Sequence, residues 1–467
     1  MLKEDGSKGK SPAFRATSVK FVIGTGIAAF LVIQFIIANA RVPEYAKIQT
    51  YARVDAWLES ARCAVKTGTF LTTCPNGRIL PVEDVAADDR GHTLLLNLWS
   101  LLTRREPTRE DLVRLNFGLN TIGFLALSAS LAALGLRIPG LLCALLLGVY
   151  GVPGLRPNAD VTAAFPGIVT LALCPSLVLI QLLRNRIRGS WARGMAVAGA
   201  AGAAALAMLL RESIGTLGVF AFLLVATSWW LIANRAAFRS AWIIVLAILV
   251  VGSLFSTRLL LGARNVLFEV PPASGIAGHG FSHNLYLGLG VYPNPWGIKW
   301  DDAVGEETAK RVKPDVRYCS PEYYRILLQE YWRILRFHAL DVLQIYAHKF
   351  RVILGYHWAK ISPIPYALMI PTLMLLGGLW IVARRCGADL DAFPALALAL
   401  MWAGLVLQGI LAHPAYFFVY PAEILQILLL AILLEWARLW MVRLPTPSRS
   451  DPWRRVSDSG GPEKHNE

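Results

Sequence analysis

Charged residues and cysteines are both scarce in this sequence. Of its 467 residues only 16% are charged, whereas 55% are hydrophobic, and the mean hydropathy is +0.49. A soluble chain of this length would form two or three domains with charged surfaces, so the composition excludes that class. The six cysteines follow no metal-ligand spacing, and the sequence shows no internal repeat. Neither a zinc-binding protein nor a repeat protein is therefore indicated.

The net charge of +15 is distributed in a way that argues against nucleic-acid binding. Basic residues lie in short clusters between apolar runs, and no folded basic face remains. This distribution is the positive-inside pattern of membrane proteins. We therefore expect the lipid bilayer among the partners of this chain, and no nucleic acid.

Ten apolar runs have the length, or nearly the length, of a membrane-spanning helix. Because helices satisfy their own backbone hydrogen bonds in lipid, such runs predict transmembrane spans. The runs are Phe21–Ala40, Leu115–Gly135, Ile138–Pro153, Thr162–Leu183, Met195–Leu210, Gly215–Ala233, Trp242–Leu261, Pro365–Ala383, Ala392–Ala412 and Val419–Trp440. The predicted fold class is an all-α polytopic membrane protein with about ten transmembrane helices.

Short basic loops orient the predicted helices. If the N-terminus is cytoplasmic, all of these loops and the basic tail fall on the cytoplasmic side. The clusters are Arg184, Arg186, Arg188 and Arg193, then Arg235 and Arg239, then Arg384 and Arg385, and finally Arg443, Arg449, Arg454 and Arg455. We predict a cytoplasmic segment at 1–20, a transmembrane domain at 21–440 and a disordered cytoplasmic tail at 441–467. Outer loops fall at about 41–114 and about 262–364.

The first outer loop combines an amphipathic segment with several carboxylates. Glu44–Lys66 has apolar residues at helical spacing, which predicts a helix lying on the membrane, and Asp55 belongs to it. Cys63 and Cys74 share this loop, either as a disulfide or as free thiols. A polar cluster precedes a short apolar stretch and comprises Glu83, Asp84, Asp88, Asp89, Arg90 and His92.

Ionisable residues also lie at the ends of two apolar runs. Asp160 immediately precedes one run, and Arg211-Glu212 ends another at the same predicted outer face. Such groups are costly near the membrane and usually line a polar cavity or pair with each other. An Arg211–Glu212 ion pair, or simple exposure at the interface, is the alternative to a functional site.

The first half of the chain resembles GT-C-type glycosyltransferases, membrane enzymes that take a sugar from a polyprenyl-phosphate carrier. Asp55-Ala56-Trp57-Leu58 is similar to the segment that opens the first outer loop in that family. Asp89-Arg90-Gly91-His92 resembles the basic turn that follows it. Asp160 resembles a second aspartate at the outer start of the fourth span.

The resemblance extends over about Phe21–Leu223 and the last two helices. Ala203–Leu210 with Arg211 looks like the family's Ala/Leu-rich span that ends in a basic residue. His413-Pro414-Ala415-Tyr416 is similar to the family's basic-Tyr pattern before the last span, with His413 standing where the family often has Arg.

The resemblance implies a role for each of these residues. Asp55 would be the catalytic base, and Asp160 would support it or bind the acceptor. Arg90, His92 and Arg211 would bind the donor phosphate. Because Asp55 lies further beyond the first span than is usual in the family, Glu44 or Asp89 could hold its role. The other candidates are Glu44, Asp89, His283, His413 and Tyr416.

The implied reaction is transfer of a sugar, with inversion, from a polyprenyl phosphate to a glycan, lipid or protein acceptor. It would take place on the periplasmic face of a bacterial inner membrane. Such an enzyme needs one essential base, unlike the two-carboxylate arrangement of glycoside hydrolases. The cofactor is unknown, a divalent metal is an open option, and no metal ligand is assigned.

Two other classes remain open. His283-Asn284-Leu285-Tyr286 is similar to a motif of O-antigen ligases and polymerases, which would depend on His283 instead of Asp55. That motif normally runs into a span, whereas Pro293–Asp302 is polar and rich in turns, so a folded cap is the alternative. A transporter would be expected to show repeat halves.

Tyr323–Trp358 is helical in pattern but broken by charge, and we place it at the outer interface.

The topology prediction can be tested with reporter fusions. Fusions at Lys20 and at Glu467 should both report the cytoplasm, because the basic clusters place both termini there. A periplasmic signal at Glu467 alone would mean that Leu340–Trp358 crosses the membrane and that the count of ten spans is wrong.

Overall fold

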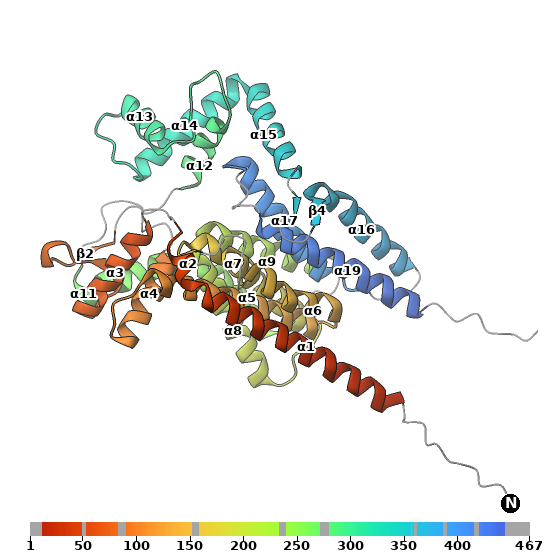
Figure 1. Ribbon diagram of the computed structural model, residues 1–467. Coiled ribbons are helices and arrows are strands. Elements are labelled where there is room, and N and C mark those ends of the chain that lie inside the picture. Colours follow the sequence, from red (N-terminus) through yellow and green to blue (C-terminus); the bar gives the residue numbers. More distant parts are fainter. Residues whose placement is uncertain are drawn as a thin grey trace, which may run out of the picture.

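The structure is a computed structural model that describes residues 12–48, 53–82, 90–151, 158–232, 240–270, 280–355, 357–358, 362–385, 390–414 and 420–443. The described elements are predominantly helices (Figure 1). Two short antiparallel pairs of strands join β1 (Thr72–Thr73) to β2 (Leu80–Pro81) and β3 (His357–Trp358) to β4 (Ser362–Pro365).

Each of the ten predicted runs corresponds to a helix of one bundle. These helices are α1 (Pro12–Ala40), α5 (Arg109–Ala133), α6 (Arg137–Leu146) continued by η3 (Leu147–Gly151), η4 (Val161–Ala164) with α7 (Phe165–Leu183), α8 (Ser190–Leu210), α9 (Glu212–Ile232), α10 (Ala241–Gly252) continued by η6 (Ser253–Phe255) and α11 (Ser256–Phe268), α16 (Met369–Arg385) after η8 (Tyr366–Leu368), α17 (Phe393–Leu411) and α19 (Pro421–Arg443). By length and composition, seven of them can cross a membrane, and Thr25–Ala40 and Arg137–Gly151 are shorter apolar helices. Helix α16, with 17 residues, belongs to neither group. The fold is thus an α-helical, polytopic membrane protein.

One predicted run was too short at its C-terminal end. The run predicted at Trp242–Leu261 continues as a helix to Phe268. Its extra turns pack against the first loop, where Phe268 contacts Phe70 and Arg264 donates a hydrogen bond to the Leu71 carbonyl.

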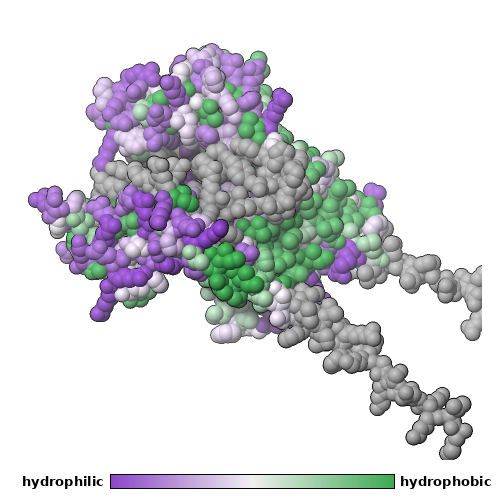
Figure 2. Space-filling view, in the orientation of Figure 1, coloured by the Kyte–Doolittle hydropathy of each residue, from purple (hydrophilic) through white to green (hydrophobic). Residues whose placement is uncertain are grey.

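Helix α7 forms the centre of the bundle, and all of its residues are buried. Helices α5, α8, α9 and α17 pack around it. The outward side of the bundle is hydrophobic in Figure 2, whereas the first-loop end and the α12–α15 group are mostly hydrophilic. An apolar outer surface on the spanning helices is what a lipid bilayer requires, because lipid offers no hydrogen-bond partner to polar groups.

The first loop folds into α2 (Val42–Ala46), α3 (Arg53–Thr67), η1 (Pro75–Gly77) and α4 (Arg90–Thr103). The predicted single helix over Glu44–Lys66 is therefore two helices. Helix α3 buries Val54, Trp57, Leu58 and Ala61 against α4, while Asp55 lies on its exposed side. A disulfide between Cys63 and Cys74 ties the end of α3 to the hairpin, which decides the alternative that the sequence left open.

The second loop folds into a group of helices that we call the cap: α12 (Phe281–Gly288) with η7 (Leu289–Val291), α13 (Asp302–Val312), α14 (Pro321–Phe337) and α15 (Ala339–Leu354). The cap has its own core, which includes Tyr286, Leu289, Ala309, Tyr323, Leu327 and Val342. The predicted interfacial stretch Tyr323–Trp358 is divided at His338, which follows α14 and precedes α15. Neither helix is among the seven that can cross a membrane.

Helices α5 and α7 approach so closely that their contact needs glycine. A Cβ added to Gly167 would lie 2.5 Å from Asn120 Cα and 2.6 Å from the Leu119 carbonyl oxygen. The Asn120 side chain bonds in the same place, accepting from the Gly167 N–H and donating to the Gly151 and Ala163 carbonyls. This contact fixes where α7 begins, and therefore fixes the residues that precede it.

We expect Gly167→Ala to lower the melting temperature of the detergent-solubilised protein. Overpacking costs about 1–3 kcal/mol, which exceeds the roughly 1 kcal/mol gained when alanine replaces glycine inside a helix. The matched control is Gly202→Ala in α8, where an added Cβ meets nothing within 4 Å. Equal melting temperatures for the two variants would show that the α5–α7 contact yields more easily than the structure implies.

Candidate functional site

A buried ion pair joins the first loop to the bundle. The Arg53 guanidinium at the start of α3 binds both oxygens of Asp160, with Nε–Oδ2 and Nη2–Oδ1 distances of 2.7 Å each. The side chains are 12% and 2% exposed. Paired hydrogen bonds of this kind fix geometry as well as charge. The pair therefore sets the position of α3 over the start of α7.

The surrounding backbone holds Asp160 from several directions. Its carboxylate accepts a hydrogen bond from the Thr162 amide and caps η4, while its own amide donates to Asn158 Oδ1. The Asn116 side chain donates to the Asn158 and Asp160 carbonyls, and the Tyr420 hydroxyl donates to the Thr162 carbonyl. Residues of α5 and η4 thus hold this aspartate directly, and Tyr420, just before α19, holds η4.

The charge state of Asp160 follows from these contacts. Burial alone would raise the pKa of Asp160, but the hydrogen bonds and charge of Arg53, with the Thr162 amide, bring the pKa below its usual value. A carboxylate so fully engaged is held ionised. Its position favours a structural or supporting role over that of a proton acceptor.

His92 lies beside this pair, inside the protein. Its side chain is fully buried in α4 and packs on Trp57, with ring centroids 5.0 Å apart. Among the described residues, neither ring nitrogen has a hydrogen-bond partner. Burial lowers the pKa of His92 to about 4, reinforced by Arg53 and opposed by Asp160. Its predicted role as a phosphate ligand stays a prediction, but in this conformation it would act as a neutral imidazole.

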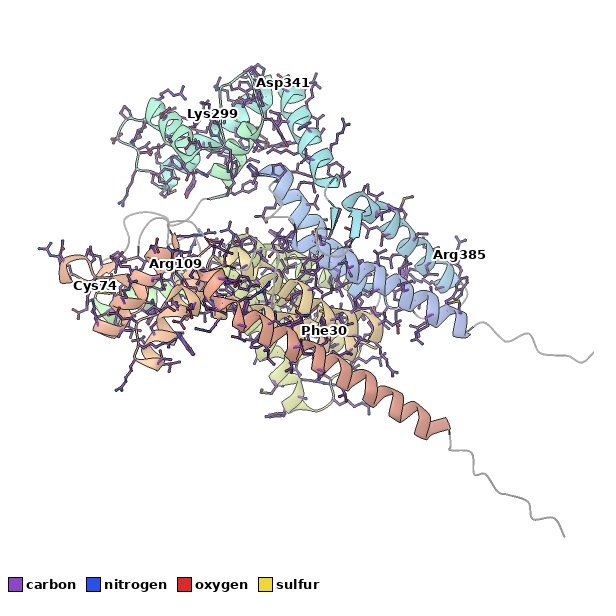
Figure 3. All side chains as sticks on the ribbon, in the orientation of Figure 1. Phe30, Cys74, Arg109, Lys299, Asp341 and Arg385 are labelled. Atoms are coloured by element: carbon purple, nitrogen blue, oxygen red, sulfur yellow. A yellow bond between two sulfur atoms is a disulfide. The ribbon has the colours of Figure 1, made fainter. Side chains whose placement is uncertain are left out.

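Asp55 lies two residues from Arg53 and faces the other way. Its carboxylate is exposed, with 65% of the side chain accessible, and it pairs with Arg109 at the start of α5 at 2.7 Å. Arg109 lies at the same end of the molecule as the Cys74 hairpin (Figure 3). The accessible carboxylate of Asp55 and the buried carboxylate of Asp160, which Arg53 binds, thus lie on two sides of the first turn of α3. Glu44, in α2, is also exposed.

The predicted phosphate ligands are distributed around this end. Arg90 is the first residue of α4. Arg211 follows the last turn of α8, and its guanidinium lies 5.6 Å from the ring centroid of Phe165 at the start of α7. The alternative Arg211–Glu212 pair is not among the described ion pairs, and Glu212 is exposed. Asp89 and Tyr416 lie outside the described residues.

His283 belongs to the core of the cap. Its side chain is buried, Nδ1 lies 2.7 Å from the Tyr323 hydroxyl, and Nε2 lies 3.1 Å from Asp302 Oδ1. Trp296 packs partly buried against the same cap, with its ring 5.6 Å from His338. This geometry favours the folded-cap alternative, because both ring nitrogens of His283 already have partners.

His413 follows α17 at the junction with the cap. Its ring lies 5.1 Å from that of Trp300. Beside it, the Lys349 ammonium of α15 is buried and donates a 2.7 Å hydrogen bond to the Ala412 carbonyl. Burial lowers the pKa of Lys349 to about 7, and burial together with the Lys349 charge lowers the pKa of His413.

Sequence reasoning missed four residues that shape this region: Arg53, Asn116, Lys349 and Glu423. Glu423 is buried in the first turn of α19 and accepts a 2.8 Å hydrogen bond from the Tyr150 hydroxyl. A charged residue in an otherwise apolar segment could have flagged Glu423, whereas Lys349 is one of several charged residues in its segment. Arg53 carried no such signal, because its partner lies 107 residues away.

Two further features of the described residues concern metal ligands and cavities. In the part of the chain that the structure describes, no group of three or more His, Cys, Asp or Glu side chains is arranged to hold a metal ion.

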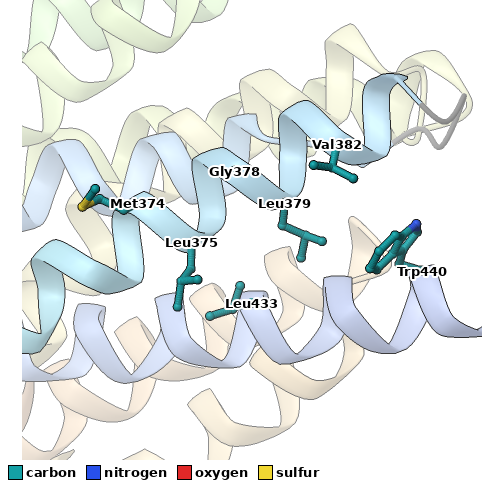
Figure 4. Close-up of a pocket in the computed structure, with 7 residues that line it drawn as sticks. All are labelled: Met374, Leu375, Gly378, Leu379, Val382, Leu433 and Trp440. Atoms are coloured by element: carbon teal, nitrogen blue, oxygen red, sulfur yellow. The ribbon is translucent and has the colours of Figure 1, made fainter.

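A pocket of about 380 Å³ lies between α16 and α19, lined by Leu375, Leu379, Leu433, Trp440 and other apolar residues (Figure 4). Such a lining offers no acid or base. The pocket adjoins the Arg385 end of α16, which lies on the other side of the picture from Cys74 (Figure 3).

Fold and site together define a multi-pass α-helical membrane protein with polar residues gathered at one end of its bundle. No protein-family model matches the chain, and no curated protein matches its sequence. Among solved structures, the chain is similar to the crystal structure of ArnT from Cupriavidus metallidurans in the apo state, with 12% sequence identity, a TM-score of 0.31, and coverage of 88% of this chain and 77% of that chain. A similarity at this level carries no functional argument.

The ion pair can be tested by a double-mutant cycle. Arg53→Gln and Asp160→Asn should each destabilise the protein by about 3 kcal/mol or more, because each leaves one buried charge facing a neutral side chain. The double variant should lose less than the sum of the two. Melting temperatures of the full-length protein in detergent measure this.

The control for the cycle is Glu106→Gln, which removes the exposed 3.8 Å pair with Arg62. It should change the free energy of unfolding by less than about 1 kcal/mol. Strictly additive losses at Arg53 and Asp160 would contradict a direct interaction between them.

Proposed function

We propose that this chain is a GT-C-type glycosyltransferase that moves a sugar from a polyprenyl phosphate to an acceptor at the outer face of a bacterial inner membrane. One observation carries the proposal. The Arg53–Asp160 pair anchors the first-loop helix to the bundle and leaves Asp55 as an exposed carboxylate at the same end. A lipid-linked donor lying in the membrane would present its sugar at this height, and an acceptor would approach Asp55 from outside.

The reaction needs one base and a place for the departing phosphate. Asp55 would accept the proton of the acceptor hydroxyl while Arg109 holds its carboxylate in place. The hydroxyl oxygen would attack the anomeric carbon from the face opposite the carrier, and the bond from that carbon to the phosphate oxygen would break. The carrier phosphate would leave as an anion, and the sugar would be inverted.

Cations at this end of the bundle suit the leaving phosphate. Arg211 follows α8 and Arg90 begins α4, so both lie where helices meet the first loop. Guanidinium groups bind phosphate through two parallel hydrogen bonds, which gives them an advantage over lysine at such sites. Asp160 would act through Arg53 as a positioning residue.

The disulfide supports an outward orientation of this site. Disulfides persist in oxidising compartments and are rare in the cytosol. The Cys63–Cys74 bond lies in the first loop, next to α3. An extracytoplasmic first loop agrees with the cytoplasmic termini that the basic clusters predict.

A transfer assay on variants tests the base. Asp55→Asn keeps the size of the side chain but removes the proton acceptor, so turnover should fall about a hundredfold or more. Glu44→Gln, Asp89→Asn and His283→Ala should retain activity when corrected for folded protein. Glu59→Gln is the matched control, because Glu59 is exposed on the same helix one turn later.

The outcomes separate the alternatives. Loss in His283→Ala alone would replace the assignment of Asp55 with a ligase-like mechanism. Loss in Glu44→Gln or Asp89→Asn alone would move the base but keep the enzyme class. Full activity in all of these variants would contradict the proposed mechanism.

A further inference from the structure

A buried lysine lies where the cap meets the bundle. Lys349 is fully buried, although it belongs to an amphipathic helix with exposed residues on its other side. Its ammonium donates to the Ala412 carbonyl at 2.7 Å and lies 5.5 Å from the ring centroid of Tyr346. Helix α15 packs against α17 at this point (Figure 1).

The ammonium is not neutralised by the residues that the structure describes. Lysine has three N–H donors, and one of them has an acceptor here. Among the described residues no carboxylate forms an ion pair with it, and burial accounts for its lowered pKa. A buried charge without a counter-charge is costly, so such a group either loses its proton or meets an anion.

A second polar group faces the same junction. His413 follows Ala412 directly, and its Nδ1 is buried with no hydrogen-bond partner among the described residues. Its ring packs on Trp300, which precedes α13 of the cap, and this contact holds its orientation. The Lys349 ammonium is close enough to lower the pKa of His413. Two nitrogen groups without acidic partners thus meet between cap and bundle.

Helix capping explains part of this arrangement. The Ala412 carbonyl lies just beyond the last turn of α17, where a cation is favourable because carbonyls there lack partners within the helix. Capping satisfies one N–H of Lys349. It does not account for the buried Nδ1 of His413 or for the missing counter-charge.

The junction is continuous with the proposed active site. One turn before Ala412, the Gln408 side chain donates to the Ser213 hydroxyl, and Ser213 lies two residues after Arg211. Beyond His413, the Tyr420 hydroxyl binds the Thr162 carbonyl next to Asp160. Lys349 and His413 therefore lie at the rim of the region that holds Asp160 and Arg211.

We propose that Lys349 and His413 form an anion-binding subsite that takes a phosphate monoester at the junction of the cap and α17. The ammonium would supply the charge and two free N–H donors, and the imidazole would supply a further hydrogen bond. This inference rests on the proposed function only in its expected ligand, the phosphate of a lipid carrier. Free phosphate has the same chemistry and is the other source.

Binding to the full-length protein in detergent tests the subsite. The probe is farnesyl phosphate, titrated calorimetrically, with farnesol as the same tail without a phosphate and inorganic phosphate as a competitor. Lys349→Gln should weaken farnesyl phosphate binding about tenfold or more, the range expected for a lost charge-assisted hydrogen bond. Farnesol binding should not change. Lys349→Arg should retain most of the affinity.

The matched control is Lys313→Gln, which removes the same charge from an exposed position of the cap. It should leave the affinity unchanged. His413→Ala should weaken farnesyl phosphate binding less than Lys349→Gln, and it serves as a second test if Lys349→Gln does not fold. If millimolar inorganic phosphate competes with farnesyl phosphate, the site is one for free phosphate. If inorganic phosphate does not compete, the site is one for lipid phosphate. Either result supports the subsite.

Two results would overturn the subsite. Unchanged farnesyl phosphate affinity in folded Lys349→Gln and His413→Ala would reduce Lys349 to a cap of α17. Equal affinities of the wild type for farnesol and for farnesyl phosphate would show that the phosphate group contributes nothing to binding. If these preparations still show transfer activity that depends on Asp55, the proposed function stands although the subsite fails. Failure of the subsite and failure of the proposed function can therefore be told apart.

Discussion

The rest of the site depends on a buried ion pair between a helix of the first loop and the start of the central span. Arg53 and Asp160 are far apart in sequence, yet both oxygens of the carboxylate are bound by the guanidinium. Removing one partner of such a pair is costly, which makes the pair a strong constraint on geometry. Helix α4 is held from another side, because a Cβ on Gly91 would lie 2.6 Å from the Leu209 backbone of α8.

This constraint divides two neighbouring carboxylates between two tasks. Asp160 is buried, fully hydrogen-bonded and held ionised, so it suits positioning. Asp55 is exposed and has one guanidinium partner, so a substrate hydroxyl can reach it. Trp57 and His92 are buried beside the ion pair, and burial lowers the pKa of His92 to about 4. At the junction of the cap and α17, Lys349 and His413 place two further nitrogen groups.

The sequence predicted the spans well because lipid imposes one requirement on every spanning segment, a long apolar helix. It also flagged Asp160, whose charge is costly at the end of such a run. It could not identify Arg53, and it left open whether Cys63 and Cys74 are bonded, because both depend on groups brought together by folding. It misjudged the first-loop helix for the same reason: periodicity suggested one amphipathic helix, whereas burial against α4 selects Trp57 and leaves Asp55 outside. Asp89 and Tyr416 stay predictions, since they lie outside the described residues.

Chemical modification of carboxylates tests this division most directly. The full-length protein would be treated with a water-soluble carbodiimide and glycine ethyl ester, and modification at residues 55 and 160 would be followed by mass spectrometry alongside transfer activity. We predict that Asp55 is modified at the rate at which activity is lost, that Asp160 is protected, and that Asp160 becomes reactive in Arg53→Gln. Full activity after complete modification of Asp55, or loss of activity that follows Asp160 instead, would contradict the account.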